Sequence, residues 1–344
     1  RLVRFLYGMK DASYAFFKFV RDAFIDFGLT PLKSDPCIYV LESDEKVLLL
    51  NKEGNTVTTN EERDQIYDRD TITVKDEKGK IVGFQLVGCD GKPMTHKIII
   101  GSYVDDCLIA YTRGNKMVPK LYEFLRSREH KFTVEPLQFF LNMHIQRDRD
   151  NRTLTLQQDQ HARKLIKEVF QQEPENINNR ETPFPDGYLP EPSQNTEGDK
   201  LVMTEEKRSE YRSWSASLLW ISRTVPEIKH SVGQLCRHMH NPSVDHYNDV
   251  KKVVRYLAGN LDRGLKFKGN NINVNAASDS DWGACKYTRR SCTGYAVYIG
   301  DSLVVAKSQM QKLVALSSME AELIALNECA KTVAYFRAFL GELG

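Results

Sequence analysis

The 344-residue chain lacks a strong charge of either sign. Its 48 lysines and arginines nearly balance its 46 aspartates and glutamates, which leaves a formal net charge of +2. Such a chain has no strong global field, so any surface that binds nucleic acid must be a local basic patch. The chain also lacks a recognisable signal peptide and a hydrophobic run long enough to span a membrane, so we expect no membrane partner.

The seven cysteines are scattered, and no two of them form a Cys-x-x-Cys pair. This spacing argues against a structural zinc site and against the dense disulfide framework of a small secreted domain. Reduced thiols inside a cell are the default expectation, and the length suffices for two or three domains. The chain begins with Arg1 instead of methionine, and residues 341–344 directly follow a long helical pattern. Both ends are therefore predicted to be cut from a longer protein.

One short stretch, Tyr103-Val104-Asp105-Asp106, lies between two apolar runs and predicts a strand, a tight acidic turn and a second strand. Two adjacent carboxylates repel each other, and a hard divalent ion such as Mg²⁺ is the usual compensation. A catalyst that joins nucleotides uses metal-held carboxylates to align a 3′-hydroxyl and to neutralise charge on the transferring phosphate. The alternative is a solvated surface hairpin, and for four residues alone the two interpretations are evenly matched.

The segment before this stretch predicts a helix. Aromatic residues from Tyr14 to Phe27 fall near helical spacing, and Gly28 is suited to end the helix. We interpret these aromatics as core residues. Gly8 and Lys10 remain candidates for a functional role beside a nucleotide site, because a glycine lets a sugar or base pair approach the backbone closely.

Residues 41–96 form a polar segment that follows the start of a strand at residue 38. Two strand-like runs, 71–75 and 81–87, predict a hairpin. We interpret the segment as an inserted surface subdomain or a disordered loop.

The middle of the chain predicts a helix, a hairpin, a second helix and a linker. These elements are expected at residues 118–129, 139–146 with 153–157, 159–170 and 171–199. Three further helices follow, and their predicted starts are marked by Thr204, Pro226 and Ser243.

Basic residues gather on the third of these helices and after it. They are Lys251, Lys252, Arg255, Arg263, Lys266 and Lys268. Such a surface can follow a phosphate backbone, and a solvated charged face is an equally good interpretation of the charges alone.

The last segment of the chain predicts strands followed by a helix, in contrast to the helical segment before it. Strands are predicted at residues 272–277, 294–299 and 303–307, and a helix capped by Ser317 or Ser318 runs to about residue 340. Asp279 at a strand end and Glu320 in the first helical turn can share a metal at a sheet edge. Acidic residues in a first turn more often serve the helix dipole.

The ordered series of motifs resembles the reverse transcriptase–RNase H part of Ty1/copia-type retrotransposon Pol polyproteins. In the first half, the matches are Leu6-Tyr7-Gly8-Met9-Lys10 to LYGLK, Asp35-Pro36-Cys37-Ile38-Tyr39 to DPCLY, Tyr103-Val104-Asp105-Asp106 to YVDD, and residues 140–145 to a primer-gripping hairpin. In the second half, they are Tyr211-Arg212-Ser213 with Leu218-Leu219, residues 237–242, residues 278–282 (SDxDWA), residues 293–295 (TGY) and residues 317–322 (SSTEAE). The series covers nearly the whole chain apart from the inserted segment.

The resemblance implies roles for single residues. Asp105 and Asp106 would bind the catalytic Mg²⁺ (or Mn²⁺) ions, with Asp105 the main ligand. Tyr103 and Val104 would lie near the primer terminus, and Gly8 and Lys10 would belong to the incoming-nucleotide site. Asp279 and Glu320 would be two of four metal-binding carboxylates of RNase H, whereas Asp281 and Glu322 only match neighbouring letters of the motifs.

Departures from the family pattern matter as well. The family's first polymerase aspartate lies upstream of LYGLK, and its later RNase H carboxylates follow the last helix, so neither is expected in this chain. Asp11-Ala12-Ser13 replaces the usual Q-(A/S)-P, and Asn142 replaces a glycine in the primer-gripping hairpin. A two-metal site without a bridging ligand typically loses most of its rate.

Two hypotheses follow. The first is an RNA-directed DNA polymerase with RNase H, which binds an RNA template, a DNA primer, an RNA–DNA hybrid and deoxynucleoside triphosphates. Other Pol segments are candidates to complete its sites, and the resemblance implies a cytoplasmic virus-like particle with passage into the nucleus. The second is an inactive remnant that at most binds nucleic acid. An unrelated soluble protein with chance motifs is disfavoured by the ordered series.

The expected fold class is α+β. A truncated reverse-transcriptase palm would occupy residues 1–170, with the insert at about 41–96, and a linker would follow at 171–203. A helical thumb or connection would occupy 204–270, and an incomplete RNase H-like α/β domain 271–344.

Overall fold

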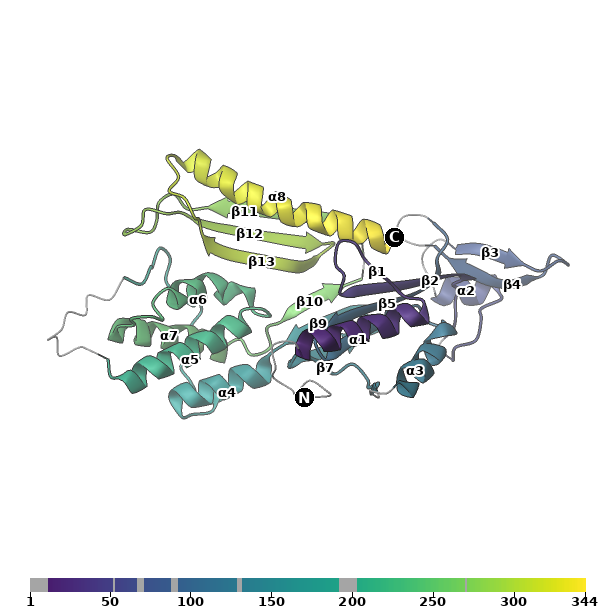
Figure 1. Ribbon diagram of the computed structural model, residues 1–344, viewed down its shortest axis with the longest axis horizontal. Helices are drawn as coiled ribbons and strands as arrows, with labels where there is room; N and C mark the ends of the chain where they lie inside the picture. Colours follow the sequence, from purple (N-terminus) through teal and green to yellow (C-terminus); the bar gives the residue numbers. More distant parts are fainter. Residues whose placement is uncertain are drawn as a thin grey trace, which may run out of the picture. The chain divides into compact units, whose positions relative to one another are not determined.

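The computed structural model describes residues 12–51, 53–66, 71–87, 92–128, 132–191, 203–269 and 271–344. The chain divides into two compact units, one of residues 1–136 with 337–344 and the other of residues 137–336. Both units combine helices with antiparallel strands (Figure 1), which confirms the α+β class. The palm, thumb and RNase H assignments and their boundaries stay predictions. None of the described helices is long and apolar enough to cross a membrane.

The first unit is built on a four-stranded antiparallel sheet in the order β1-β2-β5-β6. Its strands are β1 (Thr30–Pro31), β2 (Ile38–Lys46), β5 (Thr95–Tyr103) and β6 (Asp106–Tyr111). Alternate residues of β5 are buried, as expected for a sheet with one face on a core.

Two helices of the first unit, α1 (Ala12–Phe27) and α3 (Met117–Ser127), share this core with the sheet. The rings of Phe24 and Tyr39 meet edge to face at 5.0 Å. Gly28, at a φ of +104°, ends α1 as predicted.

The described residues of the inserted segment are folded. They form α2 (Asn60–Ile66) and the predicted hairpin of β3 (Thr71–Lys75) and β4 (Ile81–Leu86). A small core of Leu49, Val57 and Phe84 holds them together, and the Leu49 amide donates to the Phe84 carbonyl at 2.8 Å. The segment also lengthens β2 and β5, so it extends the sheet that carries the acidic turn.

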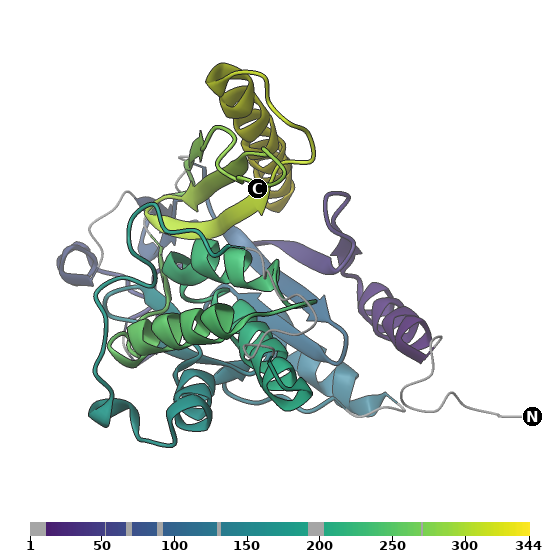
Figure 2. The same cartoon turned by 90° about the vertical axis from the view of Figure 1, so that its left-hand side faces the viewer.

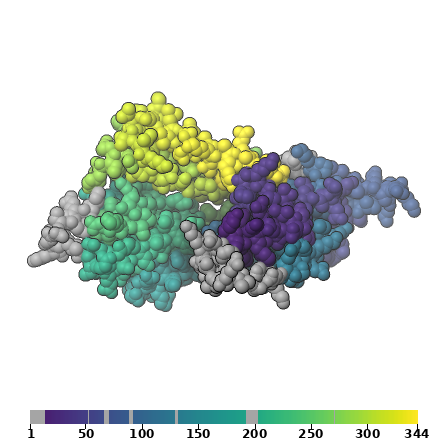
Figure 3. All heavy atoms as spheres, in the orientation of Figure 1, coloured from purple at the N-terminus to yellow at the C-terminus, as the bar shows by residue number. Residues whose placement is uncertain are grey.

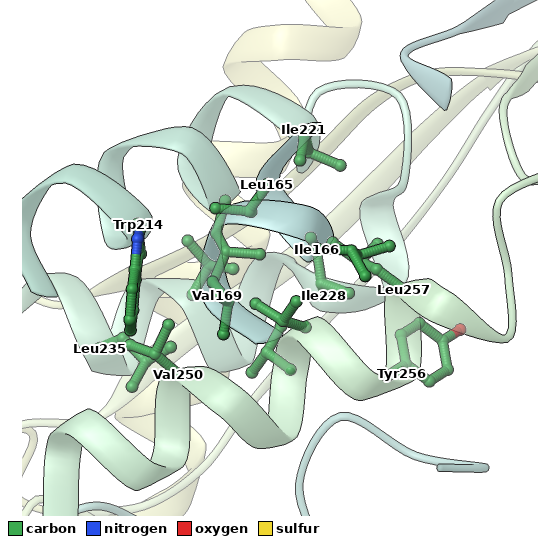
Figure 4. Close-up of a cluster of buried hydrophobic side chains, with 14 of the residues drawn as sticks. Leu165, Ile166, Val169, Trp214, Ile221, Ile228, Leu235, Val250, Tyr256 and Leu257 are labelled. Atoms are coloured by element: carbon green, nitrogen blue, oxygen red, sulfur yellow. The ribbon is translucent and has the colours of Figure 1, made fainter. Parts of the chain in front are cut away.

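The second unit contains the largest core of the described residues. It is shared by α4 (Asp159–Phe170), α5 (Glu205–Ile221), η2 (Pro226–Ile228), α6 (Lys229–Cys236) and α7 (Val244–Ala258), whose side chains meet in Figure 4. Thr204 and Ser243 cap α5 and α7 as predicted.

The stretch interpreted as a linker contributes to this core through its described residues. After η1 (Pro174–Asn176), Phe184 is buried and packs on Tyr188. The Tyr188 hydroxyl donates to Asp249 Oδ2 at 2.8 Å. This part of the chain is therefore fixed against α7.

One sheet of the second unit departs from the sequence prediction. Its order is β10-β9-β8-β7, and its strands are β7 (Phe139–Phe140), β8 (Met143–Asp148), β9 (Thr153–Gln157) and β10 (Leu265–Lys268). The single strand predicted at 139–146 is wrong, because a tight turn with positive φ at Leu141 and Asn142 splits it. Asparagine tolerates this left-handed region better than most residues, which suits it to a position where glycine is common in the family.

The other sheet consists of β11 (Val274–Ser280), β12 (Cys292–Ile299) and β13 (Ser302–Met310), with α8 (Ser318–Leu343) lying along it (Figure 2). Tyr295, Val297 and Cys329 form the core between sheet and helix. α8 exposes the large apolar side chains of Met319, Leu323 and Leu326, and its atoms are coloured yellow in Figure 3. α6 packs against β13, where Lys229 Nζ donates to the Ala306 carbonyl at 2.8 Å.

Candidate functional site

The acidic turn forms the tip of the β5–β6 hairpin. Tyr103 pairs with Asp106, so Val104 and Asp105 are the two residues of the turn. Val104 has a φ of +51°, a conformation that a β-branched residue rarely adopts. Backbone strain of this kind clusters at functional sites, which favours a role for the turn over a plain surface hairpin.

All four residues of the turn are exposed, with Tyr103 at 58% and Val104 at 56%. Neither Asp105 nor Asp106 forms an ion pair or hydrogen bond with any described residue, so both carboxylates are free to bind a ligand. Burial raises the pKa of Cys107, and the charge of Asp106 raises it further. The negative charge at the tip therefore makes the adjacent Cys107 thiol harder to deprotonate.

The two carboxylates fit one kind of metal site. No cluster of three or more histidine, cysteine, aspartate or glutamate side chains within the described ranges is arranged to hold a metal. Mg²⁺ usually takes one or two protein carboxylates and completes its shell with water and substrate phosphates. Asp105 and Asp106 offer that donor set, which suits a metal held jointly with a substrate.

The second acidic site lies at the end of β11 and the start of α8. Asp279 is exposed on β11, opposite Gly294, and its side chain forms no hydrogen bond or ion pair with any described residue. Glu320 Oε2 accepts from the Leu316 amide at 2.6 Å, while the Glu320 amide donates to Ser317 Oγ at 3.1 Å. Glu320 therefore caps its own helix, as the dipole argument anticipates.

Glu322, not Glu320, makes a direct bond to β11. Its Oε1 accepts from the Ser280 amide at 3.2 Å, next to Asp279. Glu322 was not predicted as a ligand from the sequence. Its spacing could have indicated its position, because Glu322 lies three and seven positions before the buried Ala325 and Cys329 and hence on the sheet side of α8.

Asp281 serves the local fold, since its Oδ1 accepts from the Cys292 amide at 2.8 Å. Gly8 and Lys10 lie outside the described residues. The structure thus describes the predicted polymerase carboxylates as a free pair and the predicted RNase H carboxylates as one free and one capping residue, and the catalytic roles of all four stay predictions.

The basic residues of α7 each pack on an aromatic ring. Lys251 Nζ lies 4.7 Å from the Tyr247 ring centre, and the Arg255 guanidinium lies 5.4 Å from that of Phe170. Lys252 lies over Tyr188 and also pairs with Asp249 at 2.7 Å. These cations are held against aromatic rings instead of moving freely in solvent.

Comparison with known proteins identifies the family. No family model and no solved structure matches the chain. Among curated proteins, it is 32% identical over 254 residues to the retrovirus-related Pol polyprotein from transposon TNT 1-94 of Nicotiana tabacum, which covers 72% of the chain and 18% of that protein.

Two Arabidopsis thaliana proteins are also similar. The match to the retrovirus-related Pol polyprotein from transposon RE1 is 27% identical over 348 residues, covering 100% of the chain and 19% of the relative. The match to that from transposon RE2 is 37% identical over 137 residues, covering 40% and 9%. The chain thus spans about a fifth or less of the length of these relatives. It belongs to the family of retrovirus-related Pol polyproteins of copia-type transposons.

Proposed function

We propose that the chain carries the nucleotide-joining centre of an RNA-directed DNA polymerase and, in its last segment, part of an RNase H. The observation that carries this proposal is the hairpin tip, where Asp105 and Asp106 lie free and exposed beside the strained Val104. The letter-for-letter match of this turn to the YVDD motif of the family supports the same role.

The reaction would join a deoxynucleoside triphosphate to a DNA primer paired with an RNA template. The primer 3′-oxygen attacks the α-phosphorus, a new P–O bond forms, pyrophosphate leaves with the electron pair, and the hydroxyl proton goes to solvent. Mg²⁺ or Mn²⁺, when bound, neutralises charge on the transferring phosphate. Asp105 is the main ligand and Asp106 the supporting one, while the exposed Tyr103 and Val104 contact the primer terminus.

The RNase H part would act on an RNA–DNA hybrid. Asp279 is its free carboxylate, and Glu320 is the second predicted ligand. Since Glu320 uses one oxygen to cap α8, only its other oxygen is free to bind a metal in the observed arrangement.

The test is Mg²⁺-dependent extension of a DNA primer on an RNA template by the purified chain. The matched variants are Asp105→Asn and, as control, Asp44→Asn, which changes an exposed aspartate on β2 of the same sheet. Because the family's first polymerase aspartate is not expected in this chain, we expect slow extension by the parent and by the control, and none by Asp105→Asn. Equal extension by all three proteins, or extension by none of them, would contradict the proposal.

A second candidate function is binding of nucleic acid without catalysis. It is favoured by the lack of a third metal-binding side chain near the acidic turn within the described residues. The cations of α7 that pack on aromatic rings, Lys251 and Arg255, also favour it. Binding of a labelled RNA–DNA duplex should weaken steeply with salt, because each neutralised phosphate contributes a slope of about −0.9. A double Lys251→Gln/Arg255→Gln variant should lower that slope, whereas a salt-independent signal would exclude this function.

A further inference from the structure

A hollow of about 310 Å³ lies within the second unit, where the junction of α5 and α6 faces the strands β10 and β13. The junction lines it with Arg223, Pro226 and Lys229, and the strands line it with Leu265 and residues 303–306. It lies apart from the acidic sites in the sequence, and neither the polymerase nor the RNase H proposal uses it.

Among the described residues, two cations and no carboxylate line this hollow. Arg223 stacks its guanidinium on Trp220, 4.7 Å from the ring centre, and its guanidinium has no hydrogen bond or ion pair with any described residue. The one acidic neighbour in the junction, Glu227, is engaged with Arg263 at 3.0 Å.

Lys229 is held in place with donors to spare. Its Nζ donates to the Ala306 carbonyl at 2.8 Å, which leaves two of its three N–H donors free. Burial lowers the pKa of Lys229, and the nearby charge of Arg223 lowers it further. The fold therefore keeps two like charges close together in a partly buried environment. An anion bound between them would relieve their mutual repulsion.

The remaining walls of the hollow are apolar, formed by Pro226, Leu265 and the β13 residues. A bare inorganic anion would leave these walls uncovered, whereas an anion attached to an apolar body would bury them. The volume is at the lower end of the range of about 300–1,000 Å³ for small-molecule sites.

We propose that this hollow binds an organic anion, a phosphate or carboxylate attached to an aromatic or aliphatic group. The acidic group contacts Arg223 and the free donors of Lys229, and the apolar part lies against β13 and Leu265. The same chemistry has two sources, a free small molecule or one nucleotide of a nucleic-acid strand.

The test is titration of the full chain with phenyl phosphate, followed by calorimetry. Inorganic phosphate and phenol serve as the two half-ligands. We expect phenyl phosphate to bind at least about ten-fold more tightly than either half-ligand. Only the whole molecule contacts the two cations and the apolar walls at the same time. Equal affinity for phenol and phenyl phosphate would overturn the proposal, as would no binding of phenyl phosphate at about 10 mM.

Arg223→Gln should weaken phenyl phosphate binding about ten-fold or more, since hydrogen bonds to charged groups are the strong ones. The fold should tolerate this change, because the guanidinium makes no hydrogen bond to the described protein. Arg212→Gln on α5 is the matched control, as Arg212 pairs with Glu205 and does not line the hollow. Equal binding by the parent and by Arg223→Gln would refute the site.

A second variant, Val304→Glu, adds a carboxylate at a residue that lines the hollow. Val304 is partly buried and also packs against the core between the sheet and α8, so the thermal midpoint of unfolding should fall. Binding measured below that midpoint should be abolished, and unchanged binding would count against the proposal. Displacement of phenyl phosphate by an oligothymidylate identifies a nucleic-acid strand as the source, and displacement only by monomeric phosphates or carboxylates identifies a free small molecule. Both displacement results support the site.

Discussion

Asp105 and Asp106 follow one another at the tip of the β5–β6 hairpin, whereas Asp279 and Glu320 belong to a strand and a helix that are distant in the sequence. The hairpin carboxylates bond to no described residue, but Glu320 caps the first turn of α8. Glu322, in the same helical turn, instead accepts a hydrogen bond from the Ser280 amide of β11.

This difference shows what local and non-local sites require. Adjacent residues on a tight turn share a site by covalent connection alone, so the hairpin needs only its two strands. A site divided between β11 and α8 also needs the helix to start and rotate correctly, and some carboxylates are used for that purpose. A motif match therefore identifies ligands more directly at a hairpin than at a sheet edge.

The largest expected effect comes from removing both free carboxylates. In Asp105→Asn/Asp106→Asn, Mg²⁺-dependent primer extension should fall by more than about 100-fold, because direct metal ligands matter at least as much as their supporting partners. The free energy of unfolding should stay within about 0.5 kcal/mol of the parent value, because these side chains hold nothing in the fold. Urea unfolding measures the second quantity, and a large loss of stability would show that the pair has a structural role.

A change of pH should alter the stability of the second unit through a pair of stacked histidines. In the second unit, His238 and His246 stack with ring centres 3.9 Å apart. Burial, followed by the charges of His246 and Arg237, lowers the pKa of His238 to about 4. Burial also lowers the pKa of His246.

Because the unfolded chain protonates His238 near pH 6.5, acid favours unfolding. The stabilising contribution of neutral His238 is fully present above pH 6.5 and is lost as the pH falls towards 4, with a slope of up to about 1.4 kcal/mol per pH unit. Urea unfolding of the parent at pH 7.5, 6 and 5 should show this slope, and His238→Gln should flatten it. Equal pH dependence of parent and variant would mean that other groups are responsible.

A smaller effect is expected from the helix cap. Glu320→Ala should lower the free energy of unfolding by about 1 kcal/mol, since it removes the acceptor for the Leu316 amide and a favourable charge at the helix start. Asp279→Asn should leave stability unchanged, and thermal unfolding compares the two variants. If Asp279→Asn is the more destabilising of the pair, the assignment of free and capping carboxylates is reversed.

Much of the fold could be predicted because its signals are local. The bounds of α4 match the predicted 159–170, and the acidic hairpin, the caps at Thr204 and Ser243 and the β3–β4 hairpin all follow from neighbouring residues. β10 was not predicted, because Leu265-Lys266-Phe267-Lys268 is short and basic and becomes a strand only by pairing with the distant β9. The bond from Glu322 to Ser280 was missed for the same reason, since the sequence does not show how α8 is rotated against β11.

The smallest expected effect tests the strain in the acidic turn. Val104 has a φ of +51°, and a β-branched residue pays for this conformation by roughly 1 kcal/mol, whereas asparagine adopts it more easily. Val104→Asn should therefore raise the free energy of unfolding by about 0.5 kcal/mol. If the strained turn has a role in catalysis, the same variant should extend primers more slowly than the parent, because its tip can relax away from the geometry that the strands impose. Val82→Asn on β4, an exposed valine outside the turn, is the control for the change of side chain. A variant that gains stability and keeps the full extension rate would show that the strain serves neither folding nor catalysis.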